Sequence, residues 1–242
     1  MHRRLYTLLL ALLIISPSVT AQPPAAARPP ATALFAGGCF WGMEAAFEKL
    51  PGVLNVESGF TGGHVPHPTY DQVSTGGSGH VEAVRITYDP AVITYARLLD
   101  HFWHNIDPTV KGRQFCETGP QYRTAIFYLD DAQRQAAETS KTALLKSGKL
   151  NHVRVPVKVD SKSYPPEFQL EAMRNAEADA RLAEQDQPRE KVQTEIRPAG
   201  PFYLAEEAHQ DYYKKHPIRF NIYGLQCGRA ARLQHIWGKE AK

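Results

Sequence analysis

The chain has 242 residues, of which 43% are hydrophobic and 22% charged, a balance typical of one folded globular domain. Its formal net charge is only +3, and Arg3 and Arg4 near the N-terminus supply two of those charges. Such a charge does not indicate nucleic acid or a membrane surface as a partner. The three cysteines, at positions 39, 116 and 227, form no CxxC or zinc-ligand spacing, so we expect no bound metal.

The N-terminal segment has the pattern of an export signal. Arg3 and Arg4 precede an apolar run at residues 5–15, and small residues follow at 18–21. The run is too short to span a bilayer. We therefore expect residues 1–21 to be a signal peptide, cleaved near Ala21, and the mature protein to be periplasmic or secreted. Residues 22–32, rich in Ala and Pro, are predicted to be a flexible leader.

Cys39 lies where a predicted strand turns into a predicted helix. The apolar residues 33–36 indicate the strand, and apolar residues at helical spacing indicate a helix that ends near Leu50. Helix N–H groups and the helix dipole favour a thiolate, so we expect the pKa of Cys39 to be lowered. The alternative is an inert structural cysteine, with Phe40 and Trp41 as parts of the core.

A carboxyl group stands on an apolar strand face further along the chain. Residues 80–89 read as a strand in which Glu82 shares a face with Val84 and Ile86. Partial burial there raises the pKa of the carboxyl and keeps it protonated, as a general acid requires. The alternative is a glutamate at a strand end with no catalytic role.

The remaining chain alternates between strands and helices. Residues 55–60, 124–129 and 192–196 are predicted strands, and helices are predicted from about Thr94 to 107 and from 131 to 146. Residues 151–189 change character, with a predicted strand at 153–159 and a highly charged helix at 167–185, and are interpreted as an inserted surface element. Gly224 and Gly228 flank Cys227, so the tail from residue 217 is predicted to be a long flexible coil. The pattern favours a two-layer α+β or α/β sandwich.

Six short motifs, in the same order, resemble those of the A-type peptide methionine sulfoxide reductases. They are Gly-Cys-Phe-Trp-Gly at 38–42, Pro-Thr-Tyr at 68–70, Gly-His-Val-Glu at 79–82, Asp-Pro-Thr at 107–109, Gln-Tyr-Arg at 121–123, and Phe-Tyr, Ala-Glu and His-Gln between 202 and 210. The chain departs from the family pattern at Glu117, where Asp is usual, at residues 115–116, where Gly-Asn is frequent, and in having residues 151–189. The resemblance implies one catalytic domain over residues 33–238, an α+β two-layer sandwich with a mixed sheet and a ferredoxin-like core.

The resemblance also implies roles for individual residues. Cys39 would attack the sulfoxide sulfur while Glu82 protonates the sulfoxide oxygen, to which Tyr70 and Tyr122 donate hydrogen bonds. Phe40 and Trp41 would wall a pocket for the S-methyl group, and His209 would help to bind the substrate. Glu117 corresponds to a carboxylate that positions water or the thiol. One pocket for the methyl group and one donor cluster for the oxygen imply that only the S epimer is reduced.

Recycling follows from the same resemblance. Cys39 becomes a sulfenic acid, Cys227 condenses with it to a Cys39–Cys227 disulfide, and a thioredoxin-like protein reduces that disulfide, with no bound cofactor. Cys116, in the loop beside Glu117, is a competitor for the resolving role. The expected partners are proteins and peptides that contain methionine sulfoxide, and the expected state is a monomer that repairs oxidised exported proteins.

Two other classes of function remain open on the sequence. A thiol peroxidase or redox-sensing protein would use the same reactive and resolving cysteines without needing Trp41, Tyr70 and Tyr122. A non-enzymatic exported binding protein would use aromatic residues as a surface and the Cys39–Cys227 pair as a structural disulfide.

Overall fold

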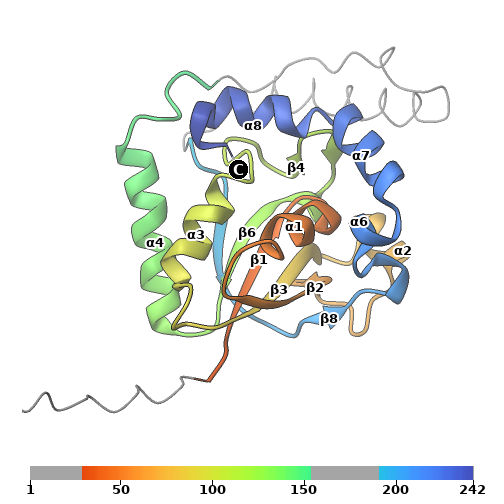
Figure 1. The fold of residues 1–242 in the computed structure, drawn as a ribbon. Coiled ribbons are helices and arrows are strands. Elements are labelled where there is room, and N and C mark those ends of the chain that lie inside the picture. Colours follow the sequence, from red (N-terminus) through yellow and green to blue (C-terminus); the bar gives the residue numbers. More distant parts are fainter. Residues whose placement is uncertain (1–28, 154–190, 242) are drawn as a thin grey trace, which may run out of the picture.

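The structure is a computed structural model that describes residues 29–153 and 191–241 (Figure 1). The predicted signal peptide, most of the predicted leader, and the predicted strand and helix of the inserted element lie outside the described residues.

A six-stranded sheet, in the order β7-β6-β1-β3-β2-β8, forms the centre of the described chain. The strands are β1 (Ala31–Gly37), β2 (Val53–Thr61), β3 (Val81–Tyr88), β6 (Thr124–Tyr128), β7 (Glu195–Pro198) and β8 (Tyr203–Leu204). Only the β6–β7 pairing is parallel, so the sheet is mixed, as predicted. Ala31 pairs with Tyr88, so the last two residues of the predicted leader belong to the sheet rather than to a flexible segment.

Between residues 29 and 153 the structure describes four helices: α1 (Phe40–Phe47), α2 (Tyr70–Ser74), α3 (Tyr95–Trp103) and α4 (Asp131–Lys146). Thr94 caps α3 by accepting a hydrogen bond from the Arg97 N–H, and Asp130 caps α4 in the same way through Gln133. Both starts agree with the sequence prediction. Between α3 and β6 lie the short strands β4 (Arg113–Gln114) and β5 (Glu117–Thr118) and the 3₁₀ turn η1 (Pro120–Tyr122).

The core lies between the sheet and the helices. Alternate residues of the strands, such as Phe35 and Ile86, meet Phe47 of α1 and Phe102 of α3, and the Phe35 and Phe102 rings stack with centroids 5.0 Å apart. Burying each such side chain contributes about 1.5–3 kcal/mol. The opposite face carries a smaller cluster around Phe127, covered by residues 199–202. The described chain is therefore an α+β fold with its helices packed mainly on one face.

The tail corrects a prediction, because it is helical instead of a long coil. It forms the 3₁₀ turn η3 (Glu207–His209), α6 (Tyr212–Lys215), α7 (Pro217–Gln226), α8 (Arg229–Trp237) and the 3₁₀ turn η4 (Gly238–Glu240). Gly228, with φ of 64°, makes the break between α7 and α8, so this glycine ends one helix rather than loosening the segment. Cys227 is the C-cap of α7.

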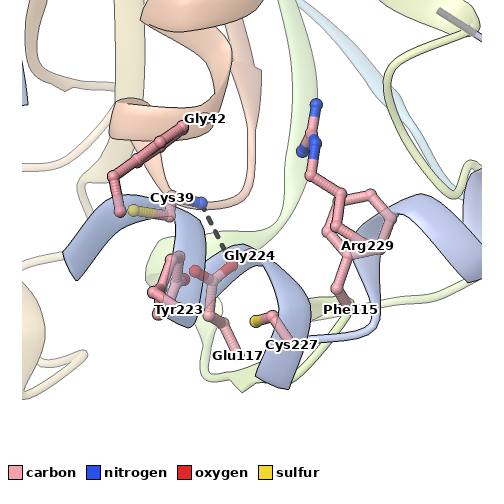
Figure 2. A pocket seen from close by; sticks show the side chains of 9 residues that line it. Cys39, Gly42, Phe115, Glu117, Tyr223, Gly224, Cys227 and Arg229 are labelled. Carbon is pink, nitrogen blue, oxygen red and sulfur yellow. Dashed lines mark hydrogen bonds between the residues drawn. The ribbon is translucent and has the colours of Figure 1, made fainter. Parts of the chain in front are cut away.

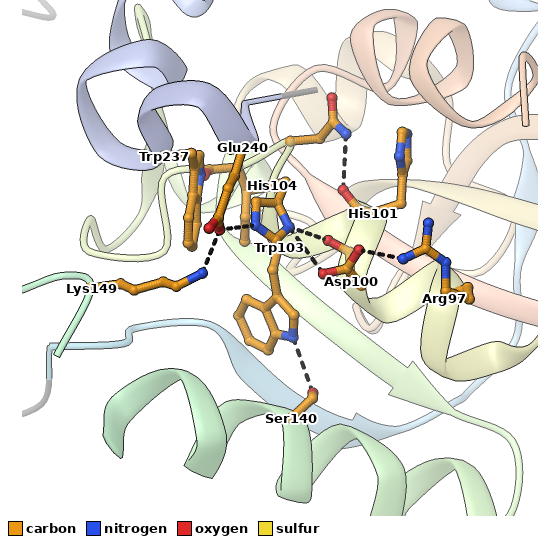
Figure 3. A network of polar contacts seen from close by, with 11 residues as sticks. Arg97, Asp100, His101, Trp103, His104, Ser140, Lys149, Trp237 and Glu240 are labelled. Carbon is orange, nitrogen blue, oxygen red and sulfur yellow. Dashed lines mark hydrogen bonds and ion pairs between the residues drawn. The ribbon is translucent and has the colours of Figure 1, made fainter. Parts of the chain in front are cut away.

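Helix α8 is fastened to the segment that follows α3. Trp237 Nε1 donates to the Ile106 carbonyl at 3.1 Å, and Arg232 Nε donates to Asp107 Oδ2 at 2.6 Å. Glu240 follows α8 in the chain, and its Oε2 lies 3.2 Å from the ring of His104, which also packs against Trp237 (Figure 3). These contacts hold the end of the chain against α3. Among the described residues, none of the helices has both the length and the apolar character needed to cross a bilayer.

Candidate active site

Cys39 is the N-cap of α1 and the one free cysteine. Its own N–H donates to Glu117 Oε2 at 3.1 Å (Figure 2). The next N–H, of Phe40, donates to Glu82 Oε2 at 3.0 Å. Gly38, with φ of 83°, allows the turn that aims the strand end at the helix. The two carboxyl groups thus bind consecutive N–H groups on either side of the cysteine.

The pKa of Cys39 is raised well above its usual value, which corrects the prediction of a lowered pKa. Burial is the largest cause, and the charges of Glu117 and Glu82 add to it, while the N–H groups of Trp41 and Gly42 act in the opposite direction. The helix terminus is present as expected. It is outweighed by burial together with the two carboxyl groups that the N–H groups of Cys39 and Phe40 hold beside the thiol.

Glu82 has the raised pKa that the sequence predicted. Its side chain is 1% exposed on β3, and burial holds the pKa well above the usual range, with a smaller contribution from the charge of Glu117. The Phe40 N–H favours the ionised form but does not outweigh burial. Only Oε2 accepts that hydrogen bond, so a neutral carboxyl with its proton on Oε1 fits the site.

Tyr70 and Tyr122 bring two hydroxyl groups to the same site. The Tyr122 hydroxyl is hydrogen-bonded to that of Tyr70, and both interact electrostatically with Glu82, Glu117 and Cys39. Burial raises the pKa of both phenols, so both are protonated donors at neutral pH. The structure therefore gathers the predicted thiol, acid and two hydroxyl donors in one place.

An aromatic wall of Trp41, His209 and Tyr212 stands beside the two tyrosines. The Trp41 ring stacks on Tyr212 with centroids 3.7 Å apart, and the His209 ring stacks on Tyr70 at 4.2 Å. Trp41 Nε1 donates to His209 Nδ1 at 3.2 Å, and burial lowers the pKa of His209, so the ring is neutral with its proton on Nε2. Phe40 is fully buried behind this wall.

Several motif residues hold the site in place. Glu206 Oε1 accepts a hydrogen bond from the Tyr70 N–H at 2.8 Å, at the start of α2. Gln210 pairs with the N–H and carbonyl of Ser58 on β2, at 2.9 and 2.8 Å, and so fixes the neighbouring His209. The sequence pointed to these motifs but gave no reason to separate the residues that line the site from those that position them.

Cys227 is bonded to Cys116, a pairing that the sequence did not predict. The Cys39–Cys227 disulfide expected during recycling stays a prediction. A cavity of about 30 Å³ separates Cys39 from α7, and Glu117, Tyr223 and Cys227 are among the residues that line it (Figure 2). Tertiary packing therefore places Cys227 close to both other cysteines. Cys116, which competed with Cys227 for the resolving role in the sequence analysis, is instead the disulfide partner of Cys227. Spacing along the chain carried no signal for this pairing, because 111 residues separate the two cysteines.

Arg229 is a residue of the site that sequence reasoning missed. Its guanidinium group interacts with Glu117 and Cys39 and lies 4.8 Å from the centroid of the Phe115 ring. Burial lowers its pKa to about 10, so it remains charged at neutral pH. Its Nη2 donates to the Asn105 carbonyl at 2.8 Å. A buried cation from α8 thus offsets the negative charge beside the thiol.

The site offers a sulfur nucleophile, a neutral acid and hydroxyl donors. Among residues 29–153 and 191–241, no group of three or more His, Cys, Asp or Glu side chains is arranged to hold a metal ion. The arrangement suits attack by sulfur on a small polar group whose oxygen must be protonated before it leaves.

Comparison with known proteins agrees with this chemistry. The sequence pattern of the family described as peptide methionine sulfoxide reductase matches residues 31–169 and 163–241. A peptide methionine sulfoxide reductase MsrA of Bacillus licheniformis is 43% identical over 208 residues, which cover 86% of this chain and 94% of that protein. The protein MsrA 2 of Caulobacter vibrioides is 42% identical over 237 residues, with 98% and 99% covered.

Two solved structures resemble the fold. The reduced form of Mxr1 from Saccharomyces cerevisiae matches with a TM-score of 0.57 and 26% identity, over 85% of this chain and 93% of that one. Methionine sulfoxide reductase A of Corynebacterium diphtheriae matches with a TM-score of 0.54 and 31% identity, over 81% and 77%.

Proposed function

The chain belongs to the peptide methionine sulfoxide reductase family, and we propose that it reduces methionine-S-sulfoxide, in peptides and proteins and as the free amino acid, through Cys39. The observation that carries this proposal is the pair of carboxyl groups, the buried Glu82 and the half-buried Glu117, that accept hydrogen bonds from consecutive N–H groups at the start of α1 beside the free thiol of Cys39.

In the first step Cys39 Sγ bonds to the sulfoxide sulfur, the neutral Glu82 protonates the sulfoxide oxygen, and the thiol proton passes back to Glu82. The resulting hydroxyl group then moves from the methionine sulfur to Cys39 Sγ while the bond between the two sulfurs breaks, so methionine leaves and Cys39 is oxidised to a sulfenic acid. Tyr70 and Tyr122 donate hydrogen bonds to the oxygen while it gains charge. The raised pKa of Cys39 means that the thiol is neutral until a substrate enters, and Arg229 counters the charge that then develops.

Selectivity for the S epimer rests on the shape of the site. Trp41 and Tyr212 provide an apolar wall for the methyl group, whereas the hydroxyl groups of Tyr70 and Tyr122 provide the oxygen site. Inverting the sulfur exchanges these two substituents. A buried oxygen without its donors costs on the order of 1–3 kcal/mol, so we expect little turnover of the R epimer.

Recycling uses all three cysteines. Cys227 condenses with the sulfenic acid, which releases water and forms the Cys39–Cys227 disulfide. Cys116 then attacks Cys227, which restores the Cys39 thiol and leaves the Cys116–Cys227 disulfide. A thioredoxin-type dithiol reduces that last disulfide. The bond between Cys116 and Cys227, together with the cavity that Cys39 and Cys227 share, supports this sequence.

The location, the oligomeric state and the biological role are proposed from the sequence. We infer that the protein is exported, acts as a monomer without stable membrane association, and repairs oxidised exported proteins. The core β1-α1-β2-β3-α3-β6, with strand order β6-β1-β3-β2, supports a ferredoxin-like description. Attachment of the export signal to a reporter enzyme, followed by cell fractionation, tests the location.

Replacing the acid tests the chemistry. Glu82→Gln should slow single-turnover reduction of a methionine-S-sulfoxide peptide by roughly 10²–10⁴-fold, the usual contribution of general acid catalysis. Because the protonated form is active, the rate of the parent should fall as pH rises through the raised pKa of Glu82. Glu57→Gln, on the neighbouring strand β2, is the matched control and should leave the rate unchanged. Equal rates for Glu82→Gln and the parent would show that the proton comes from elsewhere.

The number of methionines released per enzyme without a reductant tests the order in which the cysteines react. The fully reduced parent should release two per enzyme, because transfer to Cys116–Cys227 frees Cys39 for a second attack. Cys116→Ser should release one and stop at a Cys39–Cys227 disulfide, which mass mapping identifies. Two methionines from Cys116→Ser would remove Cys116 from the sequence of steps.

A further inference from the structure

Helix α7 carries an exposed apolar face. Ile218, Ile222 and Leu225 are 77%, 49% and 81% exposed, and their spacing of four and three residues puts them on one side of the helix. None of the residues of α7, all of which the structure describes, is buried. The outer face of α7, defined as these three residues, is therefore open to solvent along the whole helix.

The inner face of the same helix is also apolar or small. Phe220, Tyr223, Gly224 and Cys227 line the cavity next to Cys39. Arg219 is the only charged residue of α7. A helix that is apolar on both sides is normally covered on both sides, and contiguous exposed apolar residues usually mark an interaction surface. The inner face is covered by the site, so within residues 29–153 and 191–241 it is the outer face of α7 that lacks a partner.

The position of the disulfide identifies the partner. Cys227 follows Leu225 by two residues, and it is bonded to Cys116, with both cysteines half-buried. A thiolate reduces a disulfide by direct attack on one sulfur, in contact with it. Any protein that performs this reaction must therefore lie against the C-terminal end of α7.

We propose that the outer face of α7 is the docking surface for the dithiol protein that reduces the Cys116–Cys227 disulfide. The inference rests on the proposed function, because that function requires such a reductant. One thiolate of the partner attacks a sulfur of the disulfide and forms a mixed disulfide, and the other cysteine leaves as a thiol. The second thiol of the partner then displaces the remaining cysteine, so the partner becomes oxidised and both cysteines are reduced. Docking on Ile218, Ile222 and Leu225 holds the partner during these two steps.

The test compares a protein reductant with a small one. Turnover of a methionine-S-sulfoxide peptide is measured with a bacterial thioredoxin, kept reduced by thioredoxin reductase and NADPH, and separately with dithiothreitol. The double variant Ile218→Ser/Leu225→Ser should raise KM for thioredoxin about tenfold, since truncating central apolar contacts has effects of this size or larger. Its turnover with dithiothreitol should equal that of the parent, because dithiothreitol needs no docking surface.

Leu54→Ser/Val92→Ser is the matched control. These residues are 57% and 62% exposed at the start of β2 and before α3, and the change should leave KM for thioredoxin unaltered. An unchanged KM in the α7 variant, or an equal loss with both reductants, would overturn the proposal. So would concentration-dependent dimerisation of the parent that the α7 variant abolishes, because a second copy would then occupy the face. A parent without any turnover in dithiothreitol would instead refute the proposed function.

Discussion

The two helices at the end of the chain, α7 and α8, are joined at Gly228 but are held very differently. Helix α8 buries Leu233, Ile236 and Trp237 and makes polar contacts to residues 104–107, whereas α7 buries no residue. Local stability follows the number of buried contacts, so α7 is expected to open at lower cost than α8. The contrast teaches that a firmly anchored helix can serve as the base for a loosely held one.

This division suits the proposed exchange of disulfides. Cys227 must bond first to Cys39 and then to Cys116, which requires movement at the end of α7. Arg229, at the start of α8, must stay beside Glu117 to offset its charge. Because Gly228 separates the two residues, the cysteine can move while the arginine stays in place.

The largest expected effect comes from breaking the anchor of α8. Arg232→Leu should lower the free energy of unfolding by about 3 kcal/mol, because the carboxylate of Asp107, only 2% exposed, loses its one cationic partner among the described residues and keeps only the hydrogen bonds from Thr109. Arg219→Leu in α7 is the control, and exposed substitutions of this kind usually change the free energy by less than about 0.5 kcal/mol. Urea denaturation measures both. Equal losses would mean that the two helices are held equally.

A second prediction concerns the start of the tail, just before α7. Glu44 Oε1 accepts a hydrogen bond from the Asp211 N–H at 3.0 Å, and burial raises the pKa of Glu44 from 4.5 to about 7. The folded state binds this proton more tightly than the unfolded state. Its contribution to stability is therefore complete below about pH 4.5 and is lost as pH rises through about 7.

Glu44→Gln should remove this loss. Between pH 5 and pH 8 the free energy of unfolding of the parent should fall by about 2 kcal/mol more than that of the variant. Urea denaturation at the two pH values gives the difference. A variant and a parent with parallel pH profiles would show that Glu44 is already ionised at pH 5.

The smallest expected effects are two glycine-to-alanine changes that should alter the stability of the protein in opposite directions. Gly224 lies inside α7 and Gly228, with φ of 64°, lies between the helices, and a Cβ at either position meets no atom within 4 Å. Gly224→Ala should therefore stabilise the protein by about 0.5–1 kcal/mol through helix propensity. Gly228→Ala should destabilise it by about 1 kcal/mol through backbone strain. The same sign for both in thermal denaturation would show that Gly224 is not in a stable helix.

Much of the architecture was predictable because its signals are local. Thr94 and Asp130 precede helices with their capping hydroxyl and carboxyl groups, and the period-two alternation of β3 put Glu82 on the buried face with Val84 and Ile86. The tail was predicted wrongly for a related reason. Two glycines within five residues indicate a coil, but one of them forms a single break between two helices, the second of which buries Leu233, Ile236 and Trp237 against the rest of the fold.

By itself, the sequence determined the order of the longer strands and helices between residues 33 and 146, the place of Cys39 at the start of a helix, and the burial that raises the pKa of Glu82. These depend on neighbours within a few residues. Only the tertiary structure decided the raised pKa of Cys39, the position of Arg229 beside Glu117, and the bond between Cys116 and Cys227. Each of these joins segments separated by roughly 80 residues or more, and electrostatic and covalent contacts depend on distance in space, which residue spacing along the chain does not encode.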